Sequence, residues 1–134
     1  MGKFKIIAVL FAITCVLSLN NIKADSSLGF NNITIPSAQG VYESSSVKKV
    51  TTSTQYVKGF GAYDTMSGDG RALLARISGT STYYDVIDDQ YVNIDPLRLS
   101  NNPGTYKLQV KAKRWTVSTA KANLYWILDD YLIN

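Results

Sequence analysis

The chain has 134 residues, with one cysteine and no histidine. Its 14 lysines and arginines against 10 aspartates and glutamates give a formal net charge of +4. Without histidine, Ser-His-Asp and Cys-His catalysis are excluded, and so are the usual zinc sites.

The first 24 residues have the pattern of a secretory signal peptide. Lys3 and Lys5 form a basic start, residues 6–19 are apolar, and Ala24 offers a small residue at a cleavage point. This apolar stretch of 14 residues is shorter than the roughly 20 that a spanning helix needs, which favours cleavage over an uncleaved anchor. We therefore expect residues 1–24 to be removed and residues 25–134 to be secreted as a single domain.

Removal of this leader changes the composition. Cys15 and three lysines leave with it, so the exported part has eleven basic residues, ten acidic residues and no thiol. We expect neither a disulfide nor a cofactor, and the small net charge predicts no binding to nucleic acid. A packed core must hold the domain, and about 110 residues are enough for one.

Apolar and polar residues alternate through most of the exported part, as in half-buried strands. Turn residues separate the alternating segments, which is typical of a sandwich or barrel. Residues 36–49 read as a polar loop or a short irregular strand, and Gly59 and Gly61 are expected to end a strand. Residues 64–70 and 88–89 are expected to form turns. The expected strands are residues 28–35, 50–58, 71–78, 82–87 and 91–94.

The clearest local pattern follows the turn at Pro103 and Gly104. From Tyr106 to Lys113, apolar residues alternate with lysine and glutamine, which predicts a strand with one buried and one wet face. This layout resembles the penultimate strand of an immunoglobulin-like sandwich, in which a tyrosine at this corner packs inward and hydrogen-bonds to nearby backbone. The resemblance covers about a dozen residues and implies an architecture without an activity. We expect an all-β protein, a small antiparallel β-sandwich of immunoglobulin-like layout.

Residues 120–132 fit two structures. As a helix, Ala120, Leu124 and Leu128 would lie on one stripe, with Thr119 as the N-cap. As a strand, alternate residues including Trp126 would face the core. The tyrosine, tryptophan and isoleucine of this segment favour the strand. We expect it to close the sandwich beside the lysine-rich strand.

Aromatic residues are the main candidates for binding. All nine tyrosines and both tryptophans lie in the exported part. Exposed rings beside polar groups serve carbohydrate and protein recognition, although antiparallel sheets also favour tyrosine for packing alone. The candidate binding residues are Tyr83, Tyr91, Trp115 and Tyr125.

Three lysines form a second candidate surface. Lys107, Lys111 and Lys113 recur on the wet face of one strand, where they could contact teichoic acid, acidic polysaccharide or anionic lipid. The alternative is a solvated face that discourages aggregation at the sheet edge.

Three aspartates cluster in the sequence at Asp85, Asp88 and Asp89. With Asp95 they could supply oxygen ligands for calcium or a carboxylate pair for glycoside hydrolysis, and the alternative is a solvated turn. The loop over residues 64–70 does not fit a calcium loop, because Met66 and Gly68 stand where oxygen ligands are needed. We therefore expect no bound metal. If a calcium ion were bound, its ligands would come from Asp85, Asp88 and Asp89, which we call the calcium candidate.

We expect from these patterns a secreted, non-enzymatic β-sandwich that binds a cell-surface polymer or a protein partner. The polymer would be a cell-wall or extracellular polysaccharide. One alternative is a bacteriocin-like or membrane-active antagonistic protein, indicated by the amphipathic strands and the apolar tail at residues 131–133. A structural or matrix protein is another.

Overall fold

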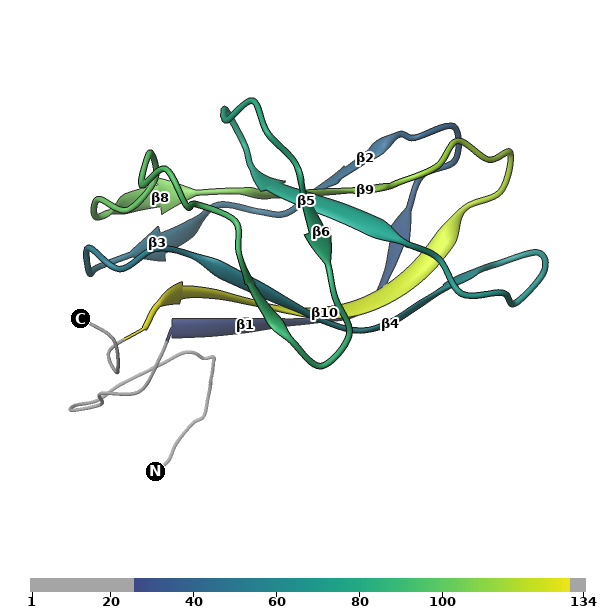
Figure 1. Cartoon of the computed structure of the whole chain (residues 1–134), viewed down its shortest axis with the longest axis horizontal. Coiled ribbons are helices and arrows are strands. Elements are labelled where there is room, and N and C mark those ends of the chain that lie inside the picture. The colour runs from purple at the N-terminus through teal and green to yellow at the C-terminus, as the bar shows by residue number, and fades with distance from the viewer. Residues whose placement is uncertain (1–25, 131–134) are drawn as a thin grey trace.

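A computed structural model of the chain describes residues 26–130, and this part is all-β and contains no helix. The expected leader and the tail at residues 131–133 lie outside the described residues. Each strand is marked in Figure 1 by its colour along the chain. The strands are β1 (Ser26–Ile35), β2 (Val41–Glu43), β3 (Val47–Lys49), β4 (Tyr56–Asp64), β5 (Leu73–Ile77), β6 (Tyr84–Val86), β7 (Tyr91–Asn93), β8 (Gly104–Tyr106), β9 (Leu108–Ala112) and β10 (Ala120–Asp129).

The strands form two antiparallel layers. The first sheet has the order β1-β10-β4-β7, and the second has the order β2-β9-β5-β6. β3 and β8 form a separate two-stranded pair that continues the second sheet toward one end. Between the two ladders, the backbone N–H of Ser44 donates to the carbonyl of Leu108 at 2.9 Å, and the backbone N–H of Leu108 donates to the hydroxyl of Ser44 at 2.9 Å. Figure 1 shows the two layers facing each other along the long axis of the molecule. This arrangement is consistent with a β-sandwich.

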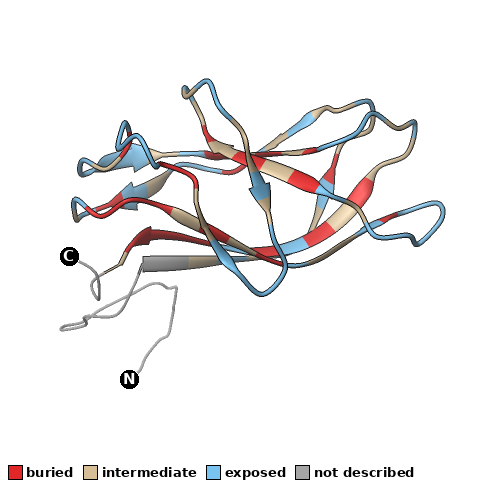
Figure 2. Cartoon of the chain, viewed as in Figure 1, coloured by how far each residue is buried: buried red, intermediate tan, exposed pale blue. Residues whose placement is uncertain are grey.

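The core lies between the sheets and follows the period of two in the sequence. On β5, Leu73, Ala75 and Ile77 are buried, while the residues between them are half-buried on the outer face. On β9, Leu108, Val110 and Ala112 are buried in the same way, which confirms the expected wet and dry faces of that strand. Figure 2 shows buried segments on strands of both sheets. Each large apolar side chain buried here contributes about 1.5 to 3 kcal/mol.

Trp126 occupies the centre of this core with no exposed surface. Its ring stacks on Phe30 of β1, with 6.5 Å between the ring centroids. Its Nε1–H donates to Oε1 of Gln55 at 2.8 Å, and Nε2 of Gln55 donates to the carbonyl of Ser100 at 2.9 Å. These two bonds satisfy the polar atoms that the core would otherwise leave unpaired.

The segment from Ala120 to Asp129 is a strand, so the strand prediction is confirmed for these residues and the helix alternative is wrong. Its expected place beside the lysine-rich strand is also wrong. That strand, β9, pairs with β2 on one side and β5 on the other, so it has no free edge. β10 instead pairs with β1 and β4 in the opposite sheet.

The expected strand over residues 50–58 is wrong in its first half. Residues 50–55 cross from the second sheet to the first, and β4 begins only at Tyr56. The two glycines expected to end a strand lie inside β4 instead. Gly61 has a φ of +115° at a register shift, where β4 has one residue more than β10 opposite Asn123. A bulge of this kind bends a strand without ending it.

A second bulge interrupts β1. The register with β10 shifts between Phe30 and Ile33, and Asn32 has a positive φ of 55°. The backbone N–H of Asn32 donates to Oδ1 of Asn123 at 2.6 Å. Asn123 therefore lies between two bulges, one in each neighbouring strand, and its side chain satisfies a backbone group that the ladder leaves unpaired.

A buried ion pair joins the second sheet to the end of β10. The side chains of Lys49, which ends β3, and Asp129 are fully buried, with 3.3 Å between Nζ and Oδ1. Lys49 Nζ also donates to the carbonyl of Leu128 at 2.6 Å and to the hydroxyl of Ser53 at 3.2 Å. Thr51 donates to Asp129 from its backbone N–H at 2.7 Å and from its hydroxyl at 2.6 Å. Burial lowers the pKa of Lys49, and the adjacent carboxylate of Asp129 opposes this shift.

We predict that Lys49→Met lowers the free energy of unfolding by about 3 to 5 kcal/mol, because it leaves the buried carboxylate of Asp129 without its cation. The control is Lys48→Met on the same strand, where the side chain is exposed. Its effect should stay within about 0.5 kcal/mol. Urea unfolding followed by circular dichroism measures both, and equal losses in the two variants would contradict the prediction.

Candidate functional site

The outer face of the first sheet carries a row of aromatic side chains. In the strand registers, Gly29 lies opposite Tyr125, Tyr125 opposite Lys58, and Lys58 opposite Tyr91. These four residues therefore follow one line across β1, β10, β4 and β7. Phe60 lies two residues beyond Lys58 on the same face of β4. We call Tyr125, Phe60, Lys58 and Tyr91 the aromatic row.

The side chains of the aromatic row contact one another. The rings of Phe60 and Tyr125 meet edge to face, with 4.8 Å between their centroids. Lys58 Nζ lies 4.8 Å from the centroid of Phe60 and 4.7 Å from that of Tyr91. Such contacts are worth roughly 0.5 to 1 kcal/mol at exposed sites. The ammonium group thus holds two rings in place on either side of it.

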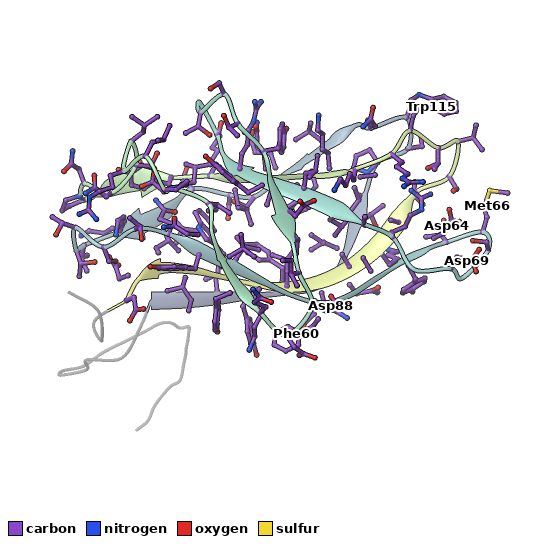
Figure 3. The ribbon with its side chains drawn as sticks, in the orientation of Figure 1. Phe60, Asp64, Met66, Asp69, Asp88 and Trp115 are labelled. Carbon is purple, nitrogen blue, oxygen red and sulfur yellow. The ribbon has the colours of Figure 1, made fainter. Side chains whose placement is uncertain are left out.

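The rings of the aromatic row remain open to solvent. Tyr125 is 41% exposed, and Phe60 and Tyr91 are each 43% exposed. Figure 3 shows Phe60 projecting away from the sandwich below the first sheet. A large apolar ring that stays this exposed, in contact with its neighbours, provides a surface on which a ligand can pack.

Gly29 allows the ring of Tyr125 to lie over the neighbouring strand. A Cβ atom at this position would come within 2.7 Å of Cε1 of Tyr125. Any residue with a side chain would push the ring away from β1. The glycine therefore sets the position of one end of the aromatic row.

The four aromatic residues predicted from the sequence separate into three places. Tyr91 and Tyr125 belong to the aromatic row. Tyr83 lies at the second sheet, where Cζ of Arg76 and Nζ of Lys111 are 4.4 Å and 4.3 Å from its ring centroid. Trp115 lies in the β9–β10 loop and is 61% exposed.

Lys58 and Phe60 were not among the residues expected from the sequence. The alternation of Tyr56, Lys58 and Phe60, with Gly59 between the last two, could have placed both residues on one face of a strand. The strand expected from the sequence ends at Lys58, so Phe60 lies outside it.

The lysine surface predicted from the sequence carries its own counter-ions. Lys113 Nζ is 2.8 Å from the carboxylate of Asp85, and Lys107 Nζ is 4.0 Å from that of Glu43. Lys111 contacts the ring of Tyr83. Much of the positive charge on this face is therefore balanced within the protein.

The three aspartates of the calcium candidate do not form one ligand cluster, and two of them have separate partners. Asp85 pairs with Lys113, and Asp88 Oδ1 accepts the backbone N–H of Gly61 at 2.9 Å. Asp89 occupies the turn between β6 and β7 with a φ of 60°. Within residues 26–130, no three acidic, histidine or cysteine side chains gather in a way that could hold a metal ion.

A separate polar cluster joins two loops at one end of the sandwich. The carboxylate of Asp64 accepts hydrogen bonds from the hydroxyl of Ser118 at 2.5 Å and from the guanidinium of Arg71. Backbone N–H groups of Met66 and Ser67 also donate to it, at 2.7 Å and 3.0 Å. These donors, with Ser118 contributing most, hold the pKa of Asp64 well below its usual range.

No protein family, curated protein or solved structure matches this chain. Across the described part of the chain, we find no helix with the length and apolar character to cross a membrane.

We predict that Asp64→Asn lowers the melting temperature at pH 7 and lowers it by clearly less at pH 2. Folding lowers the pKa of Asp64. The contribution of its carboxylate to the stability of the folded state is therefore complete above the pKa of the unfolded chain, about 3.9, and is lost as the pH falls from there toward the lower pKa of the folded state. Thermal unfolding at the two pH values measures this difference. Asp69→Asn, an exposed change in the same loop, serves as the control and should leave both melting temperatures unchanged. An equal loss for Asp64→Asn at both pH values would rule out the linkage.

Proposed function

We propose that this chain is an exported, non-enzymatic binding protein whose aromatic row holds a cell-surface polysaccharide. The observation that carries the proposal is the line of exposed, mutually contacting rings around Lys58 on the outer face of the first sheet. The aromatic row combines three exposed rings and one cation on a single face of the protein.

The chemistry of the aromatic row suits a chain of sugar rings. A pyranose ring has C–H groups on its faces and hydroxyls around its rim. The C–H groups can pack on the faces of Tyr125, Phe60 and Tyr91, while tyrosine hydroxyls and the ammonium of Lys58 bond to the rim. The row crosses three neighbouring strands, which are roughly 4.8 Å apart, so its span of about 10 Å favours an extended ligand over a single small molecule.

Two further features support the proposal. The leader predicts export to a place where surface polymers occur. The lack of histidine in the chain removes the commonest acid–base catalyst, which favours binding over catalysis.

We propose a resemblance to immunoglobulin-like sandwiches at one corner only, the turn before Tyr106. The hydroxyl of Tyr106 donates to the carbonyl of Asn102 at 2.5 Å, as a tyrosine at this corner does in that family. The last two strands of that family pair in one sheet, whereas β9 and β10 lie in different sheets here. The likeness therefore supports the local turn and carries no function.

We predict that Tyr125→Ala and Phe60→Ala each weaken binding to the polysaccharide by about tenfold or more, as expected for central aromatic contacts. Gly29→Ala should weaken it as well, because the added methyl group displaces the ring of Tyr125 without removing it. Affinity electrophoresis and pull-down on cell-wall polysaccharide fractions measure the binding.

The matched control for these variants is Tyr83→Ala, which removes a ring from the other sheet and should leave binding unchanged. Retention of the wild type on none of the fractions would overturn the proposal. If protease treatment of a fraction abolishes retention and periodate treatment does not, the ligand is a protein and the polysaccharide assignment is wrong.

Export gives an independent prediction. Expressed from its full sequence in a secreting host, the protein should appear in the medium with Asp25 as its first residue, because cleavage follows Ala24. Mass spectrometry of the secreted protein measures this. A matched variant with Ala24→Lys should be cleaved poorly, since the cleavage point requires a small residue. Full-length protein retained in the cell would contradict the prediction.

A further inference from the structure

Three large apolar side chains project into solvent at one end of the sandwich. Met66 in the β4–β5 loop is 79% exposed, and Trp115 and Val117 in the β9–β10 loop are 61% and 75% exposed. Figure 3 shows Met66 and Trp115 at the same end of the long axis, beyond the ends of the strands. We call Met66, Trp115 and Val117 the apolar tip.

Hydrogen bonds hold the two loops of the apolar tip together. Thr65 donates its backbone N–H to the carbonyl of Thr119 at 3.1 Å, and the hydroxyls of the two threonines lie 2.8 Å apart. Arg71 donates to the hydroxyl of Thr116 at 2.6 Å and to that of Ser118 at 3.0 Å. The loops therefore form one support, and the three apolar side chains cannot withdraw into the core without breaking these bonds.

The composition of the apolar tip fits the interface of a lipid bilayer. Tryptophan is enriched at this depth because its ring is apolar while its N–H remains hydrogen-bonded to the headgroup region. Met66 and Val117 would enter the acyl boundary beside it. Because these side chains lie at the end of the long axis, they can touch a flat membrane surface while the sheets stand upright on it.

The charges around the apolar tip favour an anionic surface. Arg114, directly before Trp115, is exposed and has no ion-pair partner among the residues that the structure describes. Lys113 is the next basic residue and pairs with Asp85. Asp69 in the other loop partly offsets this charge, so apolar insertion provides the main attraction and Arg114 adds a preference for acidic headgroups.

We propose that the apolar tip docks the protein on the surface of a lipid bilayer that contains anionic headgroups. Met66, Trp115 and Val117 enter the interfacial layer, and Arg114 contacts the headgroups. This contact is peripheral and uses a different surface from the aromatic row. The proposal does not involve the apolar tail at residues 131–133, which lies outside the described part of the chain.

Tryptophan fluorescence tests the docking at a known residue. The chain has two tryptophans, of which Trp126 is fully buried and Trp115 is exposed. With vesicles of phosphatidylcholine and phosphatidylglycerol, the emission of the wild type should shift to shorter wavelength and become protected from acrylamide. Trp115→Phe should abolish this shift, which assigns it to the tip.

The double variant Met66→Ser/Val117→Ser keeps Trp115 as the reporter. It should need at least about tenfold more lipid to reach half of the shift, because two inserted side chains are lost. The matched control is Leu97→Ser/Leu99→Ser, two residues that are 70% and 69% exposed on the segment leading to β8, at the opposite end of the sandwich. This control should behave as the wild type.

Three results would overturn the proposal. These are no spectral shift with anionic vesicles, vesicle binding without any change at Trp115, and equal lipid requirements for the tip variant and the wild type. Circular dichroism verifies that each variant is folded. All variants share the same residues 1–24, so a difference between them arises at the tip. Their retention on polysaccharide should be unchanged, which separates this test from that of the aromatic row.

Discussion

The ion pair of Lys49 and Asp129 is the constraint on which one end of the sandwich depends. Both charges are fully buried, so each would be costly without the other. The chain satisfies the pair by bringing residues 50–53 across the end of β10, where Thr51 and Ser53 complete the hydrogen bonds. This requirement explains why these residues cannot form a strand. After this crossing, β4 begins in the sheet opposite β3.

Local alternation was sufficient to predict several strands of the fold. β5 and β9 follow the alternation of single residues because one face of each is buried and the other is wet. The sheet to which β10 belongs could not be predicted in this way, because strand pairing depends on which edges remain free after other strands have paired. Residues 50–53 have the valine and threonine that suit a strand, but the backbone N–H groups of Val50 and Thr51 donate to the buried carboxylate of Asp129 instead of to a neighbouring strand.

The candidate site was predicted in part for similar reasons. Tyr91 and Tyr125 were identified by residue type, but 34 positions separate them in the sequence. Only the registers of β10, β4 and β7 bring them into one line, with Lys58 between them. The same registers leave Tyr83 at the other sheet. The aromatic residues predicted from the sequence therefore include only part of the site and do not show which of them lie together.

The bulge in β1 has a consequence for the behaviour of many copies of this protein. β1 is the longest strand at an edge of the first sheet, and an unbroken edge of that length could recruit a strand from another copy. The shift between Phe30 and Ile33 divides this edge into two short stretches that differ in direction. Copies crowded on one surface would thus stay separate molecules instead of joining into a continuous sheet.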